Sequence, residues 1–328
     1  MSQLTEEDSL QTPPADDPSA LLGRFVHPVQ LHQGVHRIRR LHRPGLRRLE
    51  GIWVTHDPDR QPDVVVYYVH GGGFALGSTY FYLEFQMALN SLLVDAGYNN
   101  PAIFSVEYTL VPDGLYPMQL NEIIRGYEHI LRVAGDASRV CVAGDSAGGT
   151  LVLSLLQVLG NTQTRGPSRK DVELLDASTA IAHGTTLPIP GMATLISPWV
   201  TLMSSTLFSP SGADYLDPRT LRLYARKYAG ESGARRYPAS PGSCDEEQVW
   251  RSSSPGRGYF VIYGEDEVFA SDIENFVRIQ ERLGVEIRTE KVEARVHAWP
   301  VVSLFASSTE DARLGGLRSI VDEIRNRI

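Results

Sequence analysis

Residues 144–149 read Gly-Asp-Ser-Ala-Gly-Gly, and this run constrains the fold more than any other feature of the chain. An apolar stretch, VCVA at 140–143, comes before it, and a second, LVLSLL at 151–156, comes after it. This order predicts a buried strand that enters a helix through a turn of small residues. Gly144 and Gly148 permit a sharp bend and close packing, which leaves Ser146 at the top of the turn. A serine held there becomes a nucleophile once a base lies beside it.

A glycine-rich loop upstream predicts an oxyanion-binding site. Residues 64–69 (VVVYYV) are β-branched or aromatic throughout, as in a strand covered on both faces, and HGGGF follows at 70–74. Acyl transfer through a tetrahedral intermediate needs backbone N–H donors directed at the developing oxyanion. We expect one donor from Ala147, which follows the serine, and another from Gly71 or Gly72.

The base is expected among the histidines that follow Ser146, because the order in such folds is serine, acid, histidine. Those histidines are His183 and His297. His183 lies in a polar stretch that is typical of a solvated loop. His297 follows the alternating segment 285–292 (VEIRTEKV), which predicts a late strand, and Pro300 ends the segment after it. We therefore expect His297 to be the base.

The carboxylate that orients the histidine is one of two neighbours. A predicted strand over 259–263 (YFVIY) runs into the sequence GEDE at 264–267. We favour Glu267, because the apolar Val268 and Phe269 directly after it would fix its position. Asp266 is the alternative acid.

Taken together, these motifs resemble those of the hormone-sensitive-lipase-like branch of the α/β-hydrolases. The matching segments are residues 70–74, 144–149, 197–199 (SPW) and 264–267, and the resemblance covers about residues 64–299. The stretch EYTLVPD at 107–113 and the Tyr-Pro pair at 116–117 are similar to fungal members, including steryl-acetyl-hydrolase-like and secondary-metabolite hydrolases.

The resemblance implies an α/β fold with a mostly parallel, eight-stranded-type sheet, flanking helices and a helical cap. It implies serine esterase chemistry without a cofactor, performed by a triad and an oxyanion hole of backbone amides. The triad residues would be Ser146, His297 and Glu267, and the amides would be those of Gly71, Gly72 and Ala147. Many relatives carry aspartate where this sequence has Glu267, so the alternative acid Asp266 stays open.

The resemblance also implies the domain organisation. Residues 1–50 would contribute to the cap, and residues 51–328 would form the catalytic domain with a cap insertion at about 200–250. Within that insertion, DPRTLRLYA at 217–225 predicts a helix with Asp217 as its N-cap and Pro218 at its first position.

Bulky side chains near the motifs indicate an apolar acyl or polycyclic substrate group. Those expected to bind it are Phe74, Tyr80, Phe208 and Tyr215, with Phe81 and Tyr82 beside them. Attack of water on the acyl-serine would give ester hydrolysis, whereas attack of a hydroxyl group would give a lactone or a transfer product. A binding protein is the alternative from another class, since plant gibberellin receptors resemble this branch. They have lost the catalytic histidine, and His297 argues against that function here.

Composition excludes several other functions. The net charge of −8 argues against nucleic-acid binding. The two cysteines, Cys141 and Cys244, indicate no disulfide framework. Residues 1–8 lack the features of a secretory signal, and no apolar run approaches the roughly 20 residues of a membrane span. We expect a soluble, cytoplasmic protein that binds a hydrophobic small molecule, and a homodimer remains open.

The N-terminal region carries two further patterns. His27, His32, His36 and His42 match no zinc spacing, so we expect no metal site. The basic run at 37–43 with Arg47 and Arg48 is expected to be a solvated helix face or linker rather than a lipid-binding site.

Overall fold

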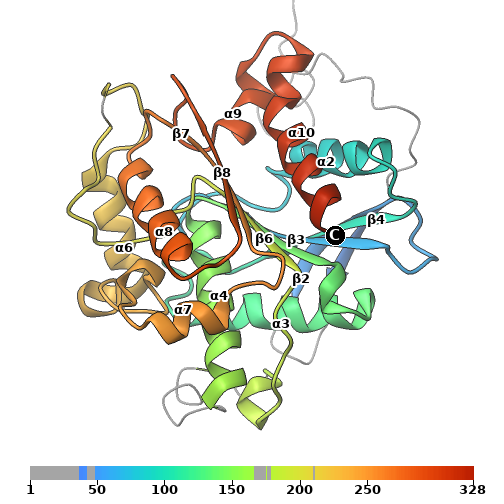
Figure 1. Cartoon of the computed structure of the whole chain (residues 1–328), viewed down its shortest axis with the longest axis horizontal. Helices are drawn as coiled ribbons and strands as arrows, with labels where there is room; N and C mark the ends of the chain where they lie inside the picture. Colours follow the sequence, from blue (N-terminus) through green and yellow to red (C-terminus); the bar gives the residue numbers. More distant parts are fainter. Residues whose placement is uncertain (1–36, 43–48, 166–174, 176–178, 210) are drawn as a thin grey trace, which may run out of the picture. The chain divides into compact units, whose positions relative to one another are not determined.

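The computed structural model describes residues 37–42, 49–165, 175, 179–209 and 211–328. Their framework is an eight-stranded sheet with the order β1-β2-β4-β3-β5-β6-β7-β8 (Figure 1). Strand β2 pairs antiparallel with β1 and β4, and the remaining pairings are parallel. The predicted mostly parallel sheet is therefore confirmed. The strands are β1 Arg37–His42, β2 Glu50–Thr55, β3 Val64–Val69, β4 Pro101–Glu107, β5 Val140–Asp145, β6 Met192–Ile196, β7 Tyr259–Gly264 and β8 Ile287–Val292.

Helices cover both faces of this sheet. Helices α3, α4 and α8 pack against one face, and α2 and α10 pack against the other, with α9 against α10 (Figure 1). Helices α6 and α7 lie in the segment between β6 and β7. The helices are α2 Leu83–Asp95, α3 Met118–Ala134, α4 Ala147–Arg165, α6 Pro218–Gly233, α7 Glu247–Ser253, α8 Ala270–Arg282, α9 Trp299–Ala306 and α10 Glu310–Arg327, and the short 3₁₀ turns are Ala137–Arg139, Ile181–His183 and Pro241–Ser243.

Strand β3 shows why a continuous apolar run suits the centre of such a sheet. All six of its residues are fully buried. Because side chains alternate along a strand, Val65, Tyr67 and Val69 enter the core on one face. Val64, Val66 and Tyr68 enter the core on the other. A polar residue at any of these positions would therefore be buried without water.

The helix predicted from residues 217–225 is present as α6. Asp217 is its N-cap, and the side chain accepts a hydrogen bond from the N–H of Thr220 at 2.9 Å. Pro218 stands at the first helical position, where its missing N–H costs no hydrogen bond. Among the helices of the described ranges, none is long and apolar enough to span a bilayer.

The sheet begins before the predicted domain boundary at residue 51. Strand β1 pairs along its whole length with β2, from Arg37 opposite Thr55 to His42 opposite Glu50. The prediction of a helix face or linker over 37–43 is therefore wrong for 37–42, because main-chain pairing makes these residues an edge strand. The other predicted cap residues before position 49, with His27, His32 and His36, lie outside the described residues.

Helix α4 starts in very close contact with the end of β3. A Cβ atom on Gly148 would lie 2.0 Å from the carbonyl oxygen of Val69 and 2.7 Å from that of His70. Both neighbours are backbone atoms, so no side-chain rotation could relieve the overlap. This contact requires glycine at position 148.

We expect Gly148→Ala to lower the free energy of unfolding by about 3 kcal/mol or more, because overpacking here must move backbone. Gly315→Ala is the matched control. Gly315 lies inside α10 with nothing near its missing Cβ, so alanine should stabilise the protein by about 0.5–1 kcal/mol. Urea denaturation followed by circular dichroism measures both changes, and wild-type stability in Gly148→Ala would contradict the close contact.

Candidate active site

Ser146 occupies a strained turn between β5 and α4. Its φ is 52°, in the left-handed region that non-glycine residues rarely adopt. Backbone hydrogen bonds hold this conformation, since its N–H donates to the carbonyl of Ile196 and its carbonyl accepts from the N–H of Trp199, each at 3.0 Å. The strand-turn-helix arrangement thus raises the serine side chain at the carboxyl edge of the sheet, where it lines a cavity.

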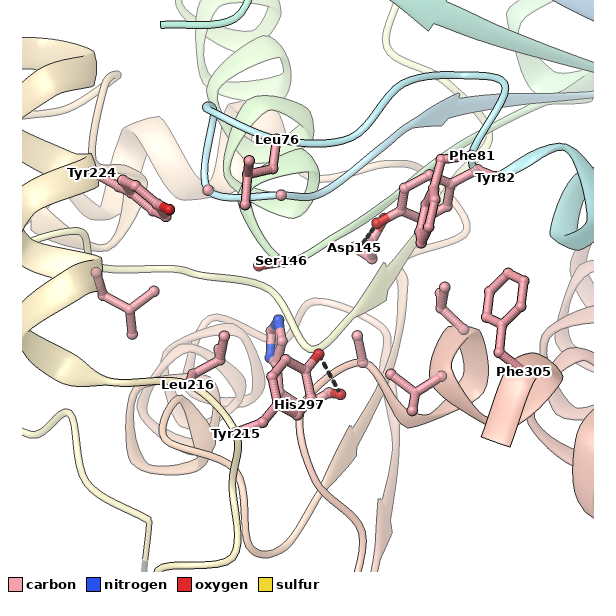
Figure 2. A pocket seen from close by; sticks show the side chains of 16 residues that line it. Leu76, Phe81, Tyr82, Asp145, Ser146, Tyr215, Leu216, Tyr224, His297 and Phe305 are labelled. Atoms are coloured by element: carbon pink, nitrogen blue, oxygen red, sulfur yellow. Dashed lines mark hydrogen bonds between the residues drawn. The ribbon is translucent and has the colours of Figure 1, made fainter. Parts of the chain in front are cut away.

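His297 and Glu267 reach the same place from two other loops. Glu267 lies between β7 and α8, and His297 lies between β8 and α9. Both side chains are buried, with 3.9 Å between Nδ1 of His297 and Oε1 of Glu267. Neither atom has a hydrogen-bond partner among the described residues. Figure 2 shows the imidazole beside Ser146 at the centre of the cavity. The structure therefore brings the predicted serine, histidine and acid together.

The alternative acid, Asp266, takes a different position. It is half-buried, and its backbone N–H donates to the carbonyl of Arg295 at 3.1 Å. Its carbonyl accepts from Ser209 Oγ at 2.7 Å. Within the described part of the chain, its carboxylate makes no close contact with the ring of His297, whereas Oε1 of Glu267 lies 3.9 Å from Nδ1.

Ser197, for which the sequence indicates no role, bonds Glu267 and the residue after His297. Its hydroxyl donates to Oε2 of Glu267 at 2.5 Å and accepts from the N–H of Ala298 at 2.9 Å. The N–H of Gly264 also donates to Oε2, at 2.9 Å. Oε1 is thereby left facing the imidazole. The Ser-Pro-Trp motif was the available signal, but it does not show which atoms the serine binds.

Of the two predicted glycine amides, that of Gly71 is engaged elsewhere and that of Gly72 lies at the cavity. The N–H of Gly71 donates to Oδ1 of Asp145 at 2.9 Å, so the prediction of Gly71 as an oxyanion donor is wrong. Gly72 and Gly73 line the cavity. Gly72 has a φ of 105°, which disfavours any side chain. Ala147 is the first residue of α4, where the N–H has no intrahelical acceptor. The amides of residues 72, 73 and 147 are therefore the candidate donors to an oxyanion.

Asp145 explains why Gly71 is unavailable. Its buried carboxylate accepts hydrogen bonds from the hydroxyls of Tyr68 and Tyr82, each at 2.8 Å, besides that from Gly71 (Figure 2 shows Tyr82). Burial raises the pKa of Asp145, and the hydrogen bonds from the two tyrosines oppose that shift. The network ties the glycine loop to the turn that carries the serine.

His70 also contacts the glycine loop. Its ring stacks on Tyr108 with 4.4 Å between centroids, and its Nδ1 donates to the carbonyl of Gly71 at 2.8 Å. Burial lowers the pKa of His70, so the neutral ring is favoured in the folded protein.

The cavity at Ser146 has a volume of about 410 Å³ and a mostly apolar lining. Figure 2 shows side chains on two sides of the serine and histidine, with Leu216 and Tyr224 on one side and Phe81, Tyr82 and Phe305 on the other. The lining residues are Gly72, Gly73, Leu76, Phe81, Tyr82, Asp145, Ser146, Tyr215, Leu216, Leu221, Tyr224, His297, Ala298, Val301, Val302 and Phe305. Of the four residues predicted for substrate binding, Tyr215 lines the cavity and the other three do not.

Three predicted substrate contacts are wrong. Phe74 is fully buried, and its ring stacks on Tyr228 of α6 with 3.8 Å between centroids. The left-handed backbone of Phe74 places the ring in the core rather than in the cavity. Tyr80 and Phe208 are 56% and 68% exposed and lie outside the lining. An aromatic residue beside a motif does not by itself reveal which way it points.

Comparison with known proteins agrees with this geometry. Residues 66–301 match a family described as the alpha/beta hydrolase fold. The chain belongs to this family. As an α/β-hydrolase with esterases among its relatives, it is an esterase-like hydrolase, and the predicted resemblance is confirmed.

Similar α/β-hydrolases include curated relatives and solved structures. The acetyl-hydrolase of Streptomyces hygroscopicus is 27% identical over 250 residues, which are 75% of this chain and 71% of the relative. The esterase LipI of Mycobacterium tuberculosis is 25% identical over 253 residues, 75% of this chain and 69% of the relative. The hormone-sensitive-lipase homologue EstE7 from a metagenome library has a TM-score of 0.67 at 23% identity, covering 94% of this chain and 90% of its own.

We expect His70→Asn to remove a pH dependence of stability. The lowered pKa means that the unfolded state takes up a proton below about pH 6.5 while folded His70 resists it, so wild-type stability falls as the pH drops. The variant should lack this loss, and the two slopes should differ by up to about 1.4 kcal/mol per pH unit. Urea denaturation between pH 5 and 7.5 measures them, and equal slopes would show that burial does not hold the ring neutral.

Proposed function

We propose that this chain hydrolyses carboxylic esters through a covalent acyl-serine intermediate. The supporting observation is that Ser146 and His297 line one apolar cavity while the buried Glu267 faces His297, each side chain coming from a separate loop. Glu267 and His297 are buried together, and among the described residues Oε1 and Nδ1 have no other partner. Such a buried pair is typical of a functional site rather than of surface side chains.

In the first half of the reaction, the hydroxyl of Ser146 attacks the ester carbonyl as His297 takes its proton. The carboxylate of Glu267 stabilises the imidazolium that forms. The carbonyl oxygen becomes an oxyanion, and the amides of Gly72, Gly73 and Ala147 donate to it. The imidazolium then protonates the alcohol oxygen, the ester C–O bond breaks, and the alcohol leaves.

In the second half, water replaces the alcohol. His297 takes a proton from water as the water oxygen attacks the acyl carbon, and the same amides bind the second oxyanion. Collapse returns the proton to Ser146 and releases the acid. Leu76, Phe81, Tyr215 and Phe305 line the cavity and are each more than half exposed, so solvent reaches the site. This access favours hydrolysis over closure to a lactone.

The substrate class follows from the lining. Apart from Asp145, Ser146 and His297, the cavity presents aliphatic and aromatic groups and two glycines. An ester of a hydrophobic small molecule would bury apolar surface there, at about 25 cal/mol for each Å² removed from water. The name of the Streptomyces relative, an acetyl-hydrolase, supports a short acyl group.

We expect Ser146→Ala to slow hydrolysis of p-nitrophenyl acetate by at least about 10,000-fold, because no other group in the site can form the acyl intermediate. A fluorophosphonate probe should label the wild type at Ser146 and leave the variant unlabelled. An unlabelled wild type, or a fully active Ser146→Ala, would favour the ligand-binding alternative and defeat the proposal.

We expect the two candidate acids to differ sharply. Glu267→Gln should lower kcat about 100- to 10,000-fold, because the imidazolium loses its carboxylate. Asp266→Asn, the matched control from the same loop, should change kcat less than about twofold. Steady-state kinetics with p-nitrophenyl acetate distinguishes them, and a larger loss in Asp266→Asn would reverse the assignment.

A further inference from the structure

The proposed acid and base depend on two loops that are far apart in the sequence. Glu267 follows β7 and His297 follows β8, so the backbone joins them only through α8 and β8. Their facing atoms lie 3.9 Å apart and have no other partner among the described residues. A small displacement of either loop would separate them further. The pair therefore needs support from outside the two loops.

Asp214 supplies such support from the segment between β6 and α6. Its Oδ2 accepts a hydrogen bond from the N–H of Val268 at 2.8 Å, and its Oδ1 accepts one from the N–H of His297 at 3.4 Å. Val268 is the residue directly after Glu267. One half-buried carboxylate thus binds the backbone of the acid loop and the backbone of the histidine itself.

Neighbouring residues strengthen this connection. The hydroxyl of Tyr215 donates to the carbonyl of His297 at 3.2 Å, as the dashed line in Figure 2 shows. Two successive residues, Asp214 and Tyr215, therefore hold the N–H and the carbonyl of His297. Tyr215 and Leu216 also line the cavity. We call residues 214–216 the clamp segment, because Asp214 bonds both loops and Tyr215 and Leu216 line the cavity.

We propose that Asp214 is a positioning residue that keeps the side chains of His297 and Glu267 facing each other. This inference rests on the proposed function. Ser197 holds the same pair from the sheet side through its contacts with Glu267 and Ala298. Asp214 holds it from the clamp segment. Asp214 does not line the cavity, so it acts on the chemical step through the loops and not through contact with the substrate.

The test compares Asp214→Ala with Asp217→Ala in the full chain. Both changes remove a carboxylate in or directly after the clamp segment, but Asp217 is exposed and caps α6 by accepting from the N–H and the hydroxyl of Thr220. With p-nitrophenyl acetate, we expect Asp214→Ala to lower kcat about 10- to 100-fold, since misplaced catalytic groups cost rate steeply. KM should change less than about twofold, and Asp217→Ala should keep kcat within about twofold of the wild type.

Asp214→Asn provides a graded variant. Its side-chain oxygen can accept one of the two N–H groups, while its NH₂ group cannot accept the other, so its kcat should fall between those of the wild type and Asp214→Ala. The acidic limb of the kcat/KM profile, which reports the free enzyme's base, should move to lower pH in Asp214→Ala. A carboxylate held less closely stabilises the imidazolium less. Both variants lose the same negative charge, so a larger shift in Asp214→Ala than in Asp214→Asn reports the loss of positioning beyond the loss of charge.

Fluorophosphonate labelling and turnover of the wild type are measured first. If both are absent, the proposed function fails and this inference with it. If the wild type is active and Asp214→Ala turns over as fast as Asp217→Ala, this inference alone is overturned. Loss of soluble protein in both Asp214 variants, with Asp217→Ala folded, would also overturn it, because the side chain would then serve folding and not positioning.

Discussion

The contact between the first turn of α4 and the end of β3 organises this molecule. The backbone at Gly148 lies so near the carbonyls of Val69 and His70 that no side chain fits. Because the helix starts there, the turn before it must bend tightly and Ser146 takes a left-handed φ. Because β3 ends there, the glycine loop begins beside that serine. The proposed nucleophile and the candidate oxyanion donors are thus neighbours as a consequence of backbone packing.

Buried polar groups then determine which atoms of that packed region remain available. The carboxylate of Asp145 is buried, and buried polar groups are normally hydrogen-bonded. It accepts hydrogen bonds from two tyrosine hydroxyls and from the N–H of Gly71. Gly72 and Gly73 line the cavity, where the proposed mechanism uses their amides. Glu267 behaves similarly, since Ser197 and Gly264 occupy Oε2 and Oε1 faces His297. In both cases, hydrogen bonds to a buried carboxylate fix the position of a neighbouring group: the glycine loop beside Asp145, and Oε1 of Glu267 facing His297.

Much of this could be predicted from sequence because the signals are local. A fully apolar run predicts a central strand, and glycines around a serine predict a tight turn. The failures concern groups whose environment comes from distant segments. The sequence places Phe74 beside a motif and so favours the cavity, yet its ring packs on Tyr228, more than 150 residues away in the chain. The basic run at 37–42 lacks apolar strand patterning, and only pairing with β2 makes it a strand.

The sequence by itself determined the fold family, the serine, and the histidine that follows the last strand, because each depends on short motifs and on their order. Tertiary structure decided which acid faces the histidine, which amides stay free, which aromatic rings line the cavity, and that Asp214 joins two loops. Those outcomes depend on hydrogen bonds and contacts between residues tens to more than a hundred positions apart. No local pattern encodes such distances, so only the folded chain shows them.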